Sequence, residues 1–179
     1  YYTANNYGYI VNYLEKGTDR VLAVAKTDTA NYGESITETA STIEGYSVSG
    51  DSSKTIVIDT ENNIINFYYT VNAYNYTVKH LEKGTDKVLV SAETFTANYS
   101  DTVSATSLKK DIAGYTYDSA NAENLIIGTG ANEITLYYTA KAYKYTVNYL
   151  EEDTDKVLST DKTDYALFGS SITENAIDI

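Results

Sequence analysis

His80 is the only histidine of the 179-residue chain, so it is the first residue to consider for acid–base or metal-binding chemistry. Three closely similar segments begin at residues 7, 74 and 143, and His80 occupies the position that Tyr13 and Tyr149 fill in the other two. A catalytic group is not expected where two of three similar segments carry tyrosine. The sequence therefore predicts that His80 is a half-buried packing residue.

Other polar clusters also favour structural roles. The acidic residues Glu151, Glu152, Asp153 and Asp155 lack the ligand spacing of an EF-hand calcium loop, so a solvated turn is expected there. Gly128–Gly130 is expected to be a hairpin tip, because a phosphate-binding loop would need a following helix. The sequence contains no G-x-S-x-G, H-E-x-x-H or Walker pattern. We therefore expect no enzyme activity, no catalytic residue, no metal site and no cofactor.

The most promising binding residues are aromatic, since the chain holds 20 Tyr. Tyr68 and Tyr137 occupy equivalent positions in the segments NIINFYYT and NEITLYYT, where period-two alternation predicts that they point away from the core. Aromatic faces stack on sugar rings, and the tyrosine hydroxyl adds a polar group. Tyr68 and Tyr137 are thus candidate ligand-binding residues. The alternative is that they pack across strands or against an adjoining segment.

The charge of the chain excludes several partner classes. Thirteen basic and 25 acidic residues give a net charge of -12, and Lys109–Lys110 is the only Lys pair. Affinity for phosphate backbones depends on clustered Lys and Arg, so nucleic acid and anionic membrane surfaces are not expected partners. The absence of cysteine excludes disulfides and thiolate metal sites. No apolar run is long enough to span a bilayer, so no membrane insertion is expected for this part of the chain.

The chain is organised as a tandem repeat. The segments YGYIVNYLEKGTDRVL, YNYTVKHLEKGTDKVL and YKYTVNYLEEDTDKVL open the three copies, and NIINFYYT and NEITLYYT close the first two. We expect four parts: residues 1–6, the tail of a preceding repeat; 7–73, copy 1; 74–142, copy 2; and 143–179, the truncated front half of copy 3.

Each copy is expected to begin with a β-hairpin. In copy 1, Tyr7, Tyr9, Val11 and Tyr13 share one face and alternate with Gly8, Ile10 and Asn12, a period-two pattern that predicts a half-buried strand. A polar turn follows at Gly17, Gly84 or Asp153, because glycine and aspartate tolerate a positive φ angle. A second strand then begins at each Val-Leu pair.

The second part of each copy is expected to contain a helix and two further strands. Ile36, Ala40 and Ile43 lie at i, i+4 and i+7, and Ser35 with Glu38 matches a helix capping box, as Ser171 with Glu174 does in copy 3. Gly45 and Gly114 fit the position where such a helix stops. The runs 56–58 and 125–127 are apolar throughout, which is typical of a strand covered on both faces. The predicted fold is α+β, in the order strand, strand, helix, strand, strand.

Three patterns together resemble the MucBP (mucin-binding protein) repeat: Y-x-V-x-Y/H-L-E-x-x-T-D-K-V-L, the central I-x-G-Y and the closing I-x-F/L-Y-Y-T. The resemblance covers essentially the whole chain. It implies a ubiquitin-like β-grasp fold, in tandem arrays on cell-wall-anchored surface proteins of Gram-positive bacteria.

Two functions follow from that resemblance and stay open. The first is a non-catalytic segment of an extracellular adhesin that binds mucin-type glycans or host glycoproteins. The second is a structural spacer that projects another domain from the cell wall and contacts only neighbouring repeats of the same chain. A glycan site needs an exposed aromatic side chain beside convergent hydrogen-bonding groups, whereas a spacer does not.

Overall fold

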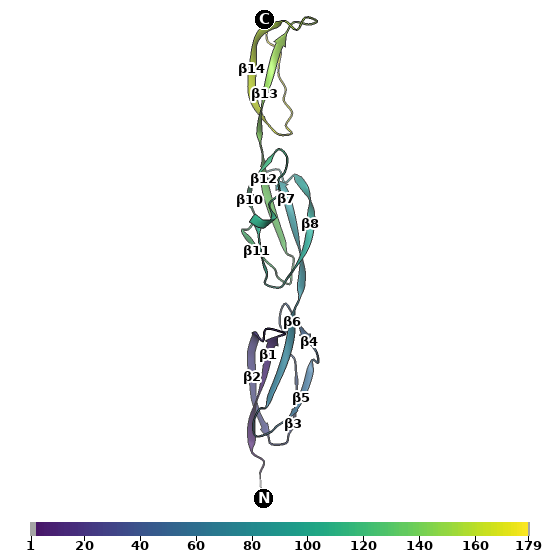
Figure 1. Cartoon of the computed structure of the whole chain (residues 1–179), viewed down its shortest axis with the longest axis vertical. Helices are drawn as coiled ribbons and strands as arrows, with labels where there is room; N and C mark the ends of the chain where they lie inside the picture. Colours follow the sequence, from purple (N-terminus) through teal and green to yellow (C-terminus); the bar gives the residue numbers. More distant parts are fainter. Residues whose placement is uncertain (1–2, 179) are drawn as a thin grey trace. The chain divides into compact units, whose positions relative to one another are not determined.

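The structure is a computed structural model that describes residues 3–178. Residues 1, 2 and 179, which belong to the expected parts 1–6 and 143–179, lie outside this range. The elements are β1 (Asn6–Glu15), β2 (Val21–Asn31), β3 (Ser35–Thr39), β4 (Tyr46–Ser49), β5 (Ser53–Val57), β6 (Ile64–Val71), β7 (Ala73–Glu82), β8 (Val88–Asn98), β9 (Thr102–Ser104), η1 (Ala105–Leu108), β10 (Tyr115–Ala120), β11 (Asn124–Ile126), β12 (Glu133–Ala140), β13 (Ala142–Leu150) and β14 (Val157–Leu167) (Figure 1).

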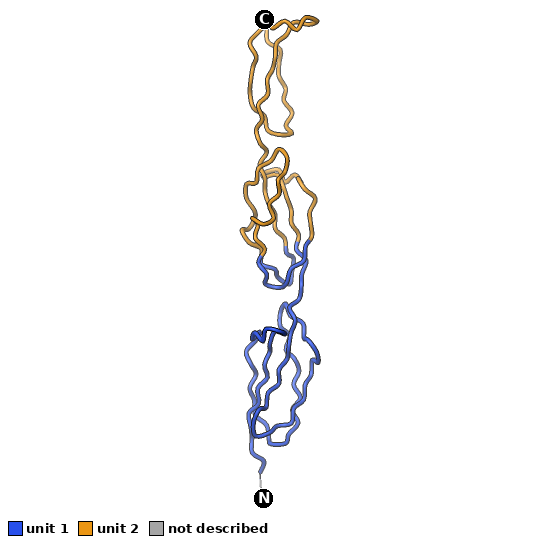
Figure 2. Tube along the Cα trace, viewed as in Figure 1, with its two compact units in different colours: residues 1–76, 95–102, 126–132 blue, residues 77–94, 103–125, 133–179 orange. Residues whose placement is uncertain are grey.

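The chain forms two compact units (Figure 2). Unit 1 holds residues 1–76, 95–102 and 126–132, and unit 2 holds residues 77–94, 103–125 and 133–179. The boundary between the units runs through copy 2, so β7 and β8 each contribute residues to both.

Copy 1 is built on a four-stranded sheet in unit 1, with the strand order β2-β1-β6-β4. The central strands β1 and β6 are parallel, and both outer pairs are antiparallel. The register places Val11 opposite Ile65 and Tyr13 opposite Phe67, and these four side chains are at most 6% exposed. Burial of each such side chain stabilises the fold by about 1.5–3 kcal/mol. The alternation read from the sequence is confirmed.

Copy 2 repeats this strand order, as β8-β7-β12-β10. Its central strands β7 and β12 are again parallel, with Val78 opposite Ile134 and His80 opposite Leu136, all at most 1% exposed. Copy 3 contributes the antiparallel hairpin β13–β14 to unit 2.

The hairpin turns confirm the prediction from the recurring nine residues. Gly17, Gly84 and Asp153 all have a positive φ angle, of 88°, 83° and 65°. The turn accepts aspartate in copy 3 because Asp is among the few residues with a side chain that enter the left-handed region at moderate cost.

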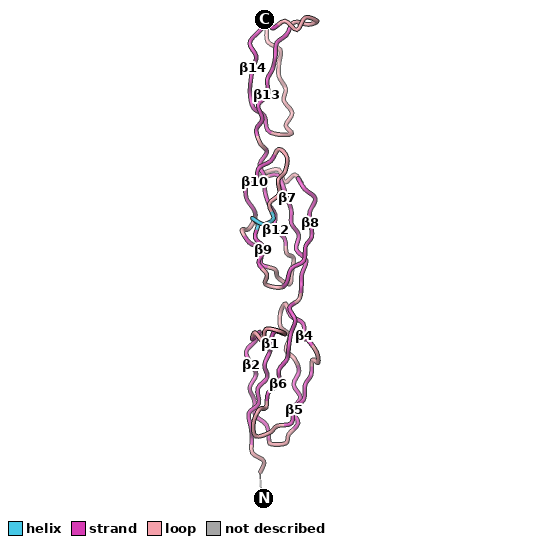
Figure 3. The backbone as a smooth tube through the Cα atoms, viewed as in Figure 1, coloured by secondary structure: helices cyan, strands magenta, loops and turns pink. Residues whose placement is uncertain are grey.

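The predicted helix is wrong, and with it the α+β, ubiquitin-like β-grasp fold. Residues 35–39 form β3, which pairs antiparallel with β5. In residues 3–178 there is no α-helix, and the 3₁₀ helix η1 is the one helical segment (Figure 3). The fold is all-β. The spacing of Ile36 and Ala40 suits one face of a strand as well as a helix, and the β-branched residues of SITET favour the strand.

Glu38, the glutamate of the predicted capping box, makes tertiary contacts in place of capping a helix. The Glu38 carboxylate accepts hydrogen bonds from the Tyr9 hydroxyl at 2.7 Å and from the Lys26 ammonium at 2.6 Å. Glu174 of copy 3 accepts the same two bonds from Tyr145 and Lys162, at 2.6 Å and 2.8 Å. In copies 1 and 3 the glutamate therefore fastens the segment after the hairpin to the hairpin itself.

The prediction for the run 56–58 is also wrong in part. Ile58 is 1% exposed, but Val57 is 62% exposed. β5 pairs only with β3 in a two-stranded sheet, which leaves one of its faces open to solvent.

Gly45 and Gly114 do not end helices, and their need for glycine has another cause. Gly45 has a φ angle of +78°, and a Cβ atom there would lie 2.1 Å from the ring of Tyr99 in the same unit. Gly45 O accepts a bond from the Asn72 amide, and Asn72 O accepts one from the Tyr99 amide. In unit 2, Gly114 and the ring of Phe168 repeat this contact.

The Glu38→Gln variant tests the carboxylate contact. The hydrogen bond from Lys26, followed by that from Tyr9, lowers the pKa of Glu38 below its ordinary value of 4.5. The contribution of Glu38 to stability is therefore present above pH 4.5 and is lost as the pH falls through the folded-state pKa. Glu38→Gln should lower the urea midpoint at neutral pH and weaken its decline in acid. The control Glu61→Gln, at an exposed residue, should leave the pH dependence unchanged.

The Gly45→Ala variant tests the contact with Tyr99. Gly50 is a matched control, because its φ angle of +97° imposes the same kind of strain while no atom lies within 4 Å of its Cβ position. Gly50→Ala should cost about 1–2 kcal/mol, and Gly45→Ala about 1–3 kcal/mol more because of the clash. The double variant Gly45→Ala/Tyr99→Ala should recover the clash portion in urea unfolding. Equal costs for the two glycine variants would contradict the contact.

Candidate functional site

Tyr68 is half-buried on the face of β6 that points away from the core, as predicted. It borders a surface depression of about 550 Å³ that is lined by polar residues and two apolar strand ends. The polar lining comprises Asp51, Ser53, Lys54, Thr55 and Asn66. Tyr68 therefore lies beside convergent hydrogen-bonding groups, the arrangement that a saccharide site requires.

Lys54 links strand β5 to strand β6 within this depression. β4 pairs with β6 only from Tyr68 onward, so the backbone of β6 before Tyr68 has an open edge on that side. The Lys54 ammonium donates a hydrogen bond to the Asn66 carbonyl at 2.7 Å and so satisfies that edge. It lies 6.0 Å from the centroid of the Tyr68 ring, within the range of a cation–π contact.

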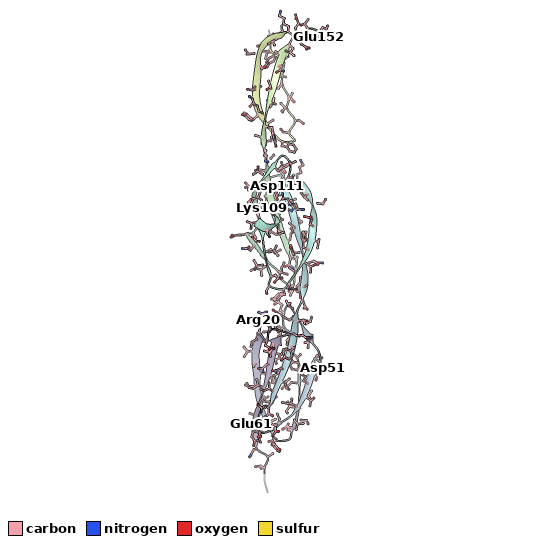
Figure 4. The ribbon with its side chains drawn as sticks, viewed as in Figure 1. Arg20, Asp51, Glu61, Lys109, Asp111 and Glu152 are labelled. Atoms are coloured by element: carbon pink, nitrogen blue, oxygen red, sulfur yellow. The ribbon has the colours of Figure 1, made fainter. Side chains whose placement is uncertain are left out.

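The depression offers both kinds of hydrogen-bonding group that sugar hydroxyls need. Lys54 can donate, Asp51 (labelled in Figure 4) can accept, and the Ser53 hydroxyl can do either. The Thr55 hydroxyl is already bonded to Thr37 at 2.7 Å. The geometry suits reversible binding of a hydroxyl-rich ligand, and it offers no nucleophile with an adjacent base.

Tyr137 has the same orientation but not the same surroundings. It lies on β12 in unit 2, whereas Tyr68 lies in unit 1. The open edge of β12 is closed by Asn121, whose side-chain oxygen accepts from the Thr135 amide at 2.9 Å. Thr135 is 6% exposed, and the sequence carries Glu123 where copy 1 carries Lys54. The two predicted tyrosines therefore do not form equivalent sites.

Lys54 is the candidate binding residue that the sequence did not reveal. Its role depends on how close β5 comes to β6, and no local pattern signals that approach. The one sequence signal is the difference between Lys54 and Glu123 at matching positions of two otherwise similar copies.

His80 is a packing residue, as predicted, although it is fully buried and not half-buried. Its Nδ1 lies 3.1 Å from the Tyr138 hydroxyl, which also accepts a hydrogen bond from the Lys110 amide at 3.0 Å. Within residues 3–178, the buried Nε2 atom has no hydrogen-bond partner. Burial, and secondly the charge of Lys110, lowers the pKa of His80.

The remaining chemical candidates show no catalytic or metal-binding geometry. Among the residues that the structure describes, no three His, Asp or Glu side chains converge as metal ligands would. The acidic stretch forms the β13–β14 turn, where the Thr154 hydroxyl donates to Glu151 at 2.6 Å. No helix between residues 3 and 178 has the length and apolar character needed to cross a membrane.

The pH dependence of stability tests the buried, neutral state of His80. The pKa of His80 is lowered from 6.5, so its contribution to the free energy of unfolding should be fully present above pH 6.5. That contribution should fall as the pH drops below 6.5, by at most about 1.4 kcal/mol per pH unit. No other side chain has an ordinary pKa in that range. His80→Tyr, which introduces the residue of the other two copies, should remove the decline between about pH 6.5 and pH 5 in urea unfolding. A decline that persists in the variant would contradict this assignment.

Comparison with known proteins agrees with the repeat structure. The model of the MucBP domain matches residues 10–70 and again residues 75–139. Internalin J of Listeria monocytogenes serotype 4b (strain F2365) is 30% identical over 162 residues, which cover 85% of this chain and 17% of Internalin J. The chain thus spans less than one fifth of the length of that relative. The two matches to the domain model cover most of the chain, which therefore belongs to the MucBP domain family.

Proposed function

We propose that this chain is a non-catalytic repeat region of a bacterial cell-surface adhesin, and that it binds mucin-type glycans or host glycoproteins. Membership of the MucBP domain family supports the adhesin role. The similarity to Internalin J supports a place on the surface of a Gram-positive bacterium. An extracellular, cell-wall-anchored location and the repeat boundaries 7–73, 74–142 and 143–179 belong to the same proposal.

The depression beside Tyr68 is the observation on which the binding function depends. An aromatic side chain, a fixed ammonium group and an acidic acceptor border one shallow surface. A shallow site of this kind supports weak binding to a single sugar. Weak sites become effective when several act on one multivalent ligand, and mucin-type glycoproteins present many glycans.

The second candidate function is a structural spacer without a ligand of its own. One observation favours it: the backbone bonds Asn72–Gly45 and Tyr99–Asn72 in unit 1 recur as Lys141–Gly114 and Phe168–Lys141 in unit 2. A spacer needs such repeated tethering between successive copies and needs no exposed aromatic site.

Binding of the whole chain to a glycan array and to purified mucin separates the two functions. The wild-type chain should bind, and Tyr68→Ala and Lys54→Ala should each weaken binding by about tenfold, the loss of a well-placed contact. Tyr137→Ala is the matched control, because Tyr137 has the same orientation while Glu123 stands at the position of Lys54, and it should bind as the wild type does. Absence of binding to both the array and mucin would reject the adhesin role for this chain and leave the spacer.

A further inference from the structure

A second cavity, of about 650 Å³, lies in unit 2 and differs in charge from the rest of the chain. Three of the 13 basic residues line it, although the chain as a whole carries a net charge of -12. Its main polar and aromatic lining is Lys109, Lys110, Lys141, Asp111, Thr116 and Tyr117. We call it the Lys109 cavity. Figure 4 labels Lys109 and Asp111 in this region.

Two of the three lysines form no ion pair with a carboxylate of the described residues. Lys110 forms an ion pair with Glu93. Within the described part of the chain, neither Lys109 nor Lys141 belongs to an ion pair. The Lys109 ammonium lies 4.0 Å from the centroid of the Tyr117 ring, and this cation–π contact restrains it while leaving its N–H donors available. The cavity therefore presents positioned positive charge to an incoming anion.

We propose that the Lys109 cavity binds a saccharide that carries a single anionic group, a carboxylate or a sulfate. The anionic group pairs with Lys109 and Lys141. The sugar hydroxyls bond to the Asp111 carboxylate and the Thr116 hydroxyl, which also line the cavity. The inference rests on the proposed function in one respect only, that the ligand is a saccharide.

The same lining disfavours a polyanion. Asp111 would repel additional negative groups, and the net charge of -12 opposes the approach of nucleic acid or other highly charged chains. A ligand with one negative charge and many hydroxyls can pair with the lysines and donate hydrogen bonds to Asp111.

Copy 1 has no such cavity lining, which makes it an internal control. Val48 pairs with Tyr69 as Tyr117 pairs with Tyr138, and the Asn72 amide bonds to Gly45 as the Lys141 amide bonds to Gly114. Val48 and Asn72 thus replace an aromatic and a basic residue at matching places. The cationic lining of copy 2 also includes Lys109 and Lys110, from a segment that is two residues longer than its counterpart in copy 1.

An NMR titration of the whole chain tests the proposal. The ligands are 3′-sialyllactose, 6-sulfated galactose, neutral lactose and inorganic sulfate. Both anionic sugars should shift the amide signals of residues 109–117 and Lys141 in a saturable way, and the affinity should fall as salt is raised from about 0.05 M to about 0.3 M. Lactose should produce no such shifts. Inorganic sulfate should bind about tenfold more weakly than the sulfated sugar, because it lacks the hydroxyl contacts.

Variants assign the shifts to named groups. Lys109→Ala and Lys141→Asn, the latter introducing the copy 1 residue, should each weaken binding of the anionic sugars by about tenfold. Lys16→Ala removes an exposed lysine of copy 1 that lines neither cavity and should leave this binding unchanged. Equal shifts with lactose, unchanged affinity in both copy 2 variants, or sulfate binding as tight as that of the sulfated sugar would each overturn the proposal.

The outcome is separable from that of the proposed function. Weakened mucin binding of Tyr68→Ala, with sialyllactose still shifting residues 109–117, would support both sites. Mucin binding without any effect of the anionic sugars on residues 109–117 would retain the adhesin role and overturn the Lys109 cavity.

Discussion

The parallel pairing of the opening and closing strands is the constraint on which each complete copy depends. Strands that run parallel cannot be joined by a tight turn, so a long stretch of chain must cross between them. In copy 1 that stretch holds β2 to β5. It supplies one outer strand on each side of the central pair and the two-stranded sheet β3–β5. The register of β1 and β6 decides which tyrosines are buried and which, like Tyr68, face outward.

The sequence predicted those features that depend on neighbours along the chain. Alternation identified the core residues of β6 and the outward Tyr68, and glycine or aspartate marked the hairpin turns. The helix prediction failed because Ile36 and Ala40 lie at a spacing that both periodicities share. A tertiary contact distinguishes the strand from the helix: Glu38 accepts a hydrogen bond from Tyr9, which lies 29 residues away along the chain. The same limit explains why Tyr68 could be predicted but Lys54 could not. Lys54 reaches the site through the approach of two strands, and the Lys109 cavity likewise depends on tertiary packing.

The copies share a backbone plan and differ in what they place on it. His80 replaces a tyrosine in the core, Asn121 replaces Lys54 as the group that satisfies the open strand edge, and Tyr117 replaces Val48. None of these changes alters the strand order. A repeated fold therefore lets one copy acquire a surface that its neighbour lacks, because the strands are secured by other residues.

The contact between Gly45 and Tyr99 has a consequence for how such a chain can change over generations. Copy 1 supplies the glycine and copy 2 supplies the ring, and copies 2 and 3 divide the roles of Gly114 and Phe168 in the same way. A copy that carries both the glycine and the ring can form this contact with the copy before it and the copy after it. Gene duplication or deletion by whole copies thus preserves a matched pair at each junction, whereas loss of either residue leaves a mismatch that a further duplication would multiply. A change in array length by whole copies would therefore conserve this glycine–ring contact, whereas a substitution of either residue would not.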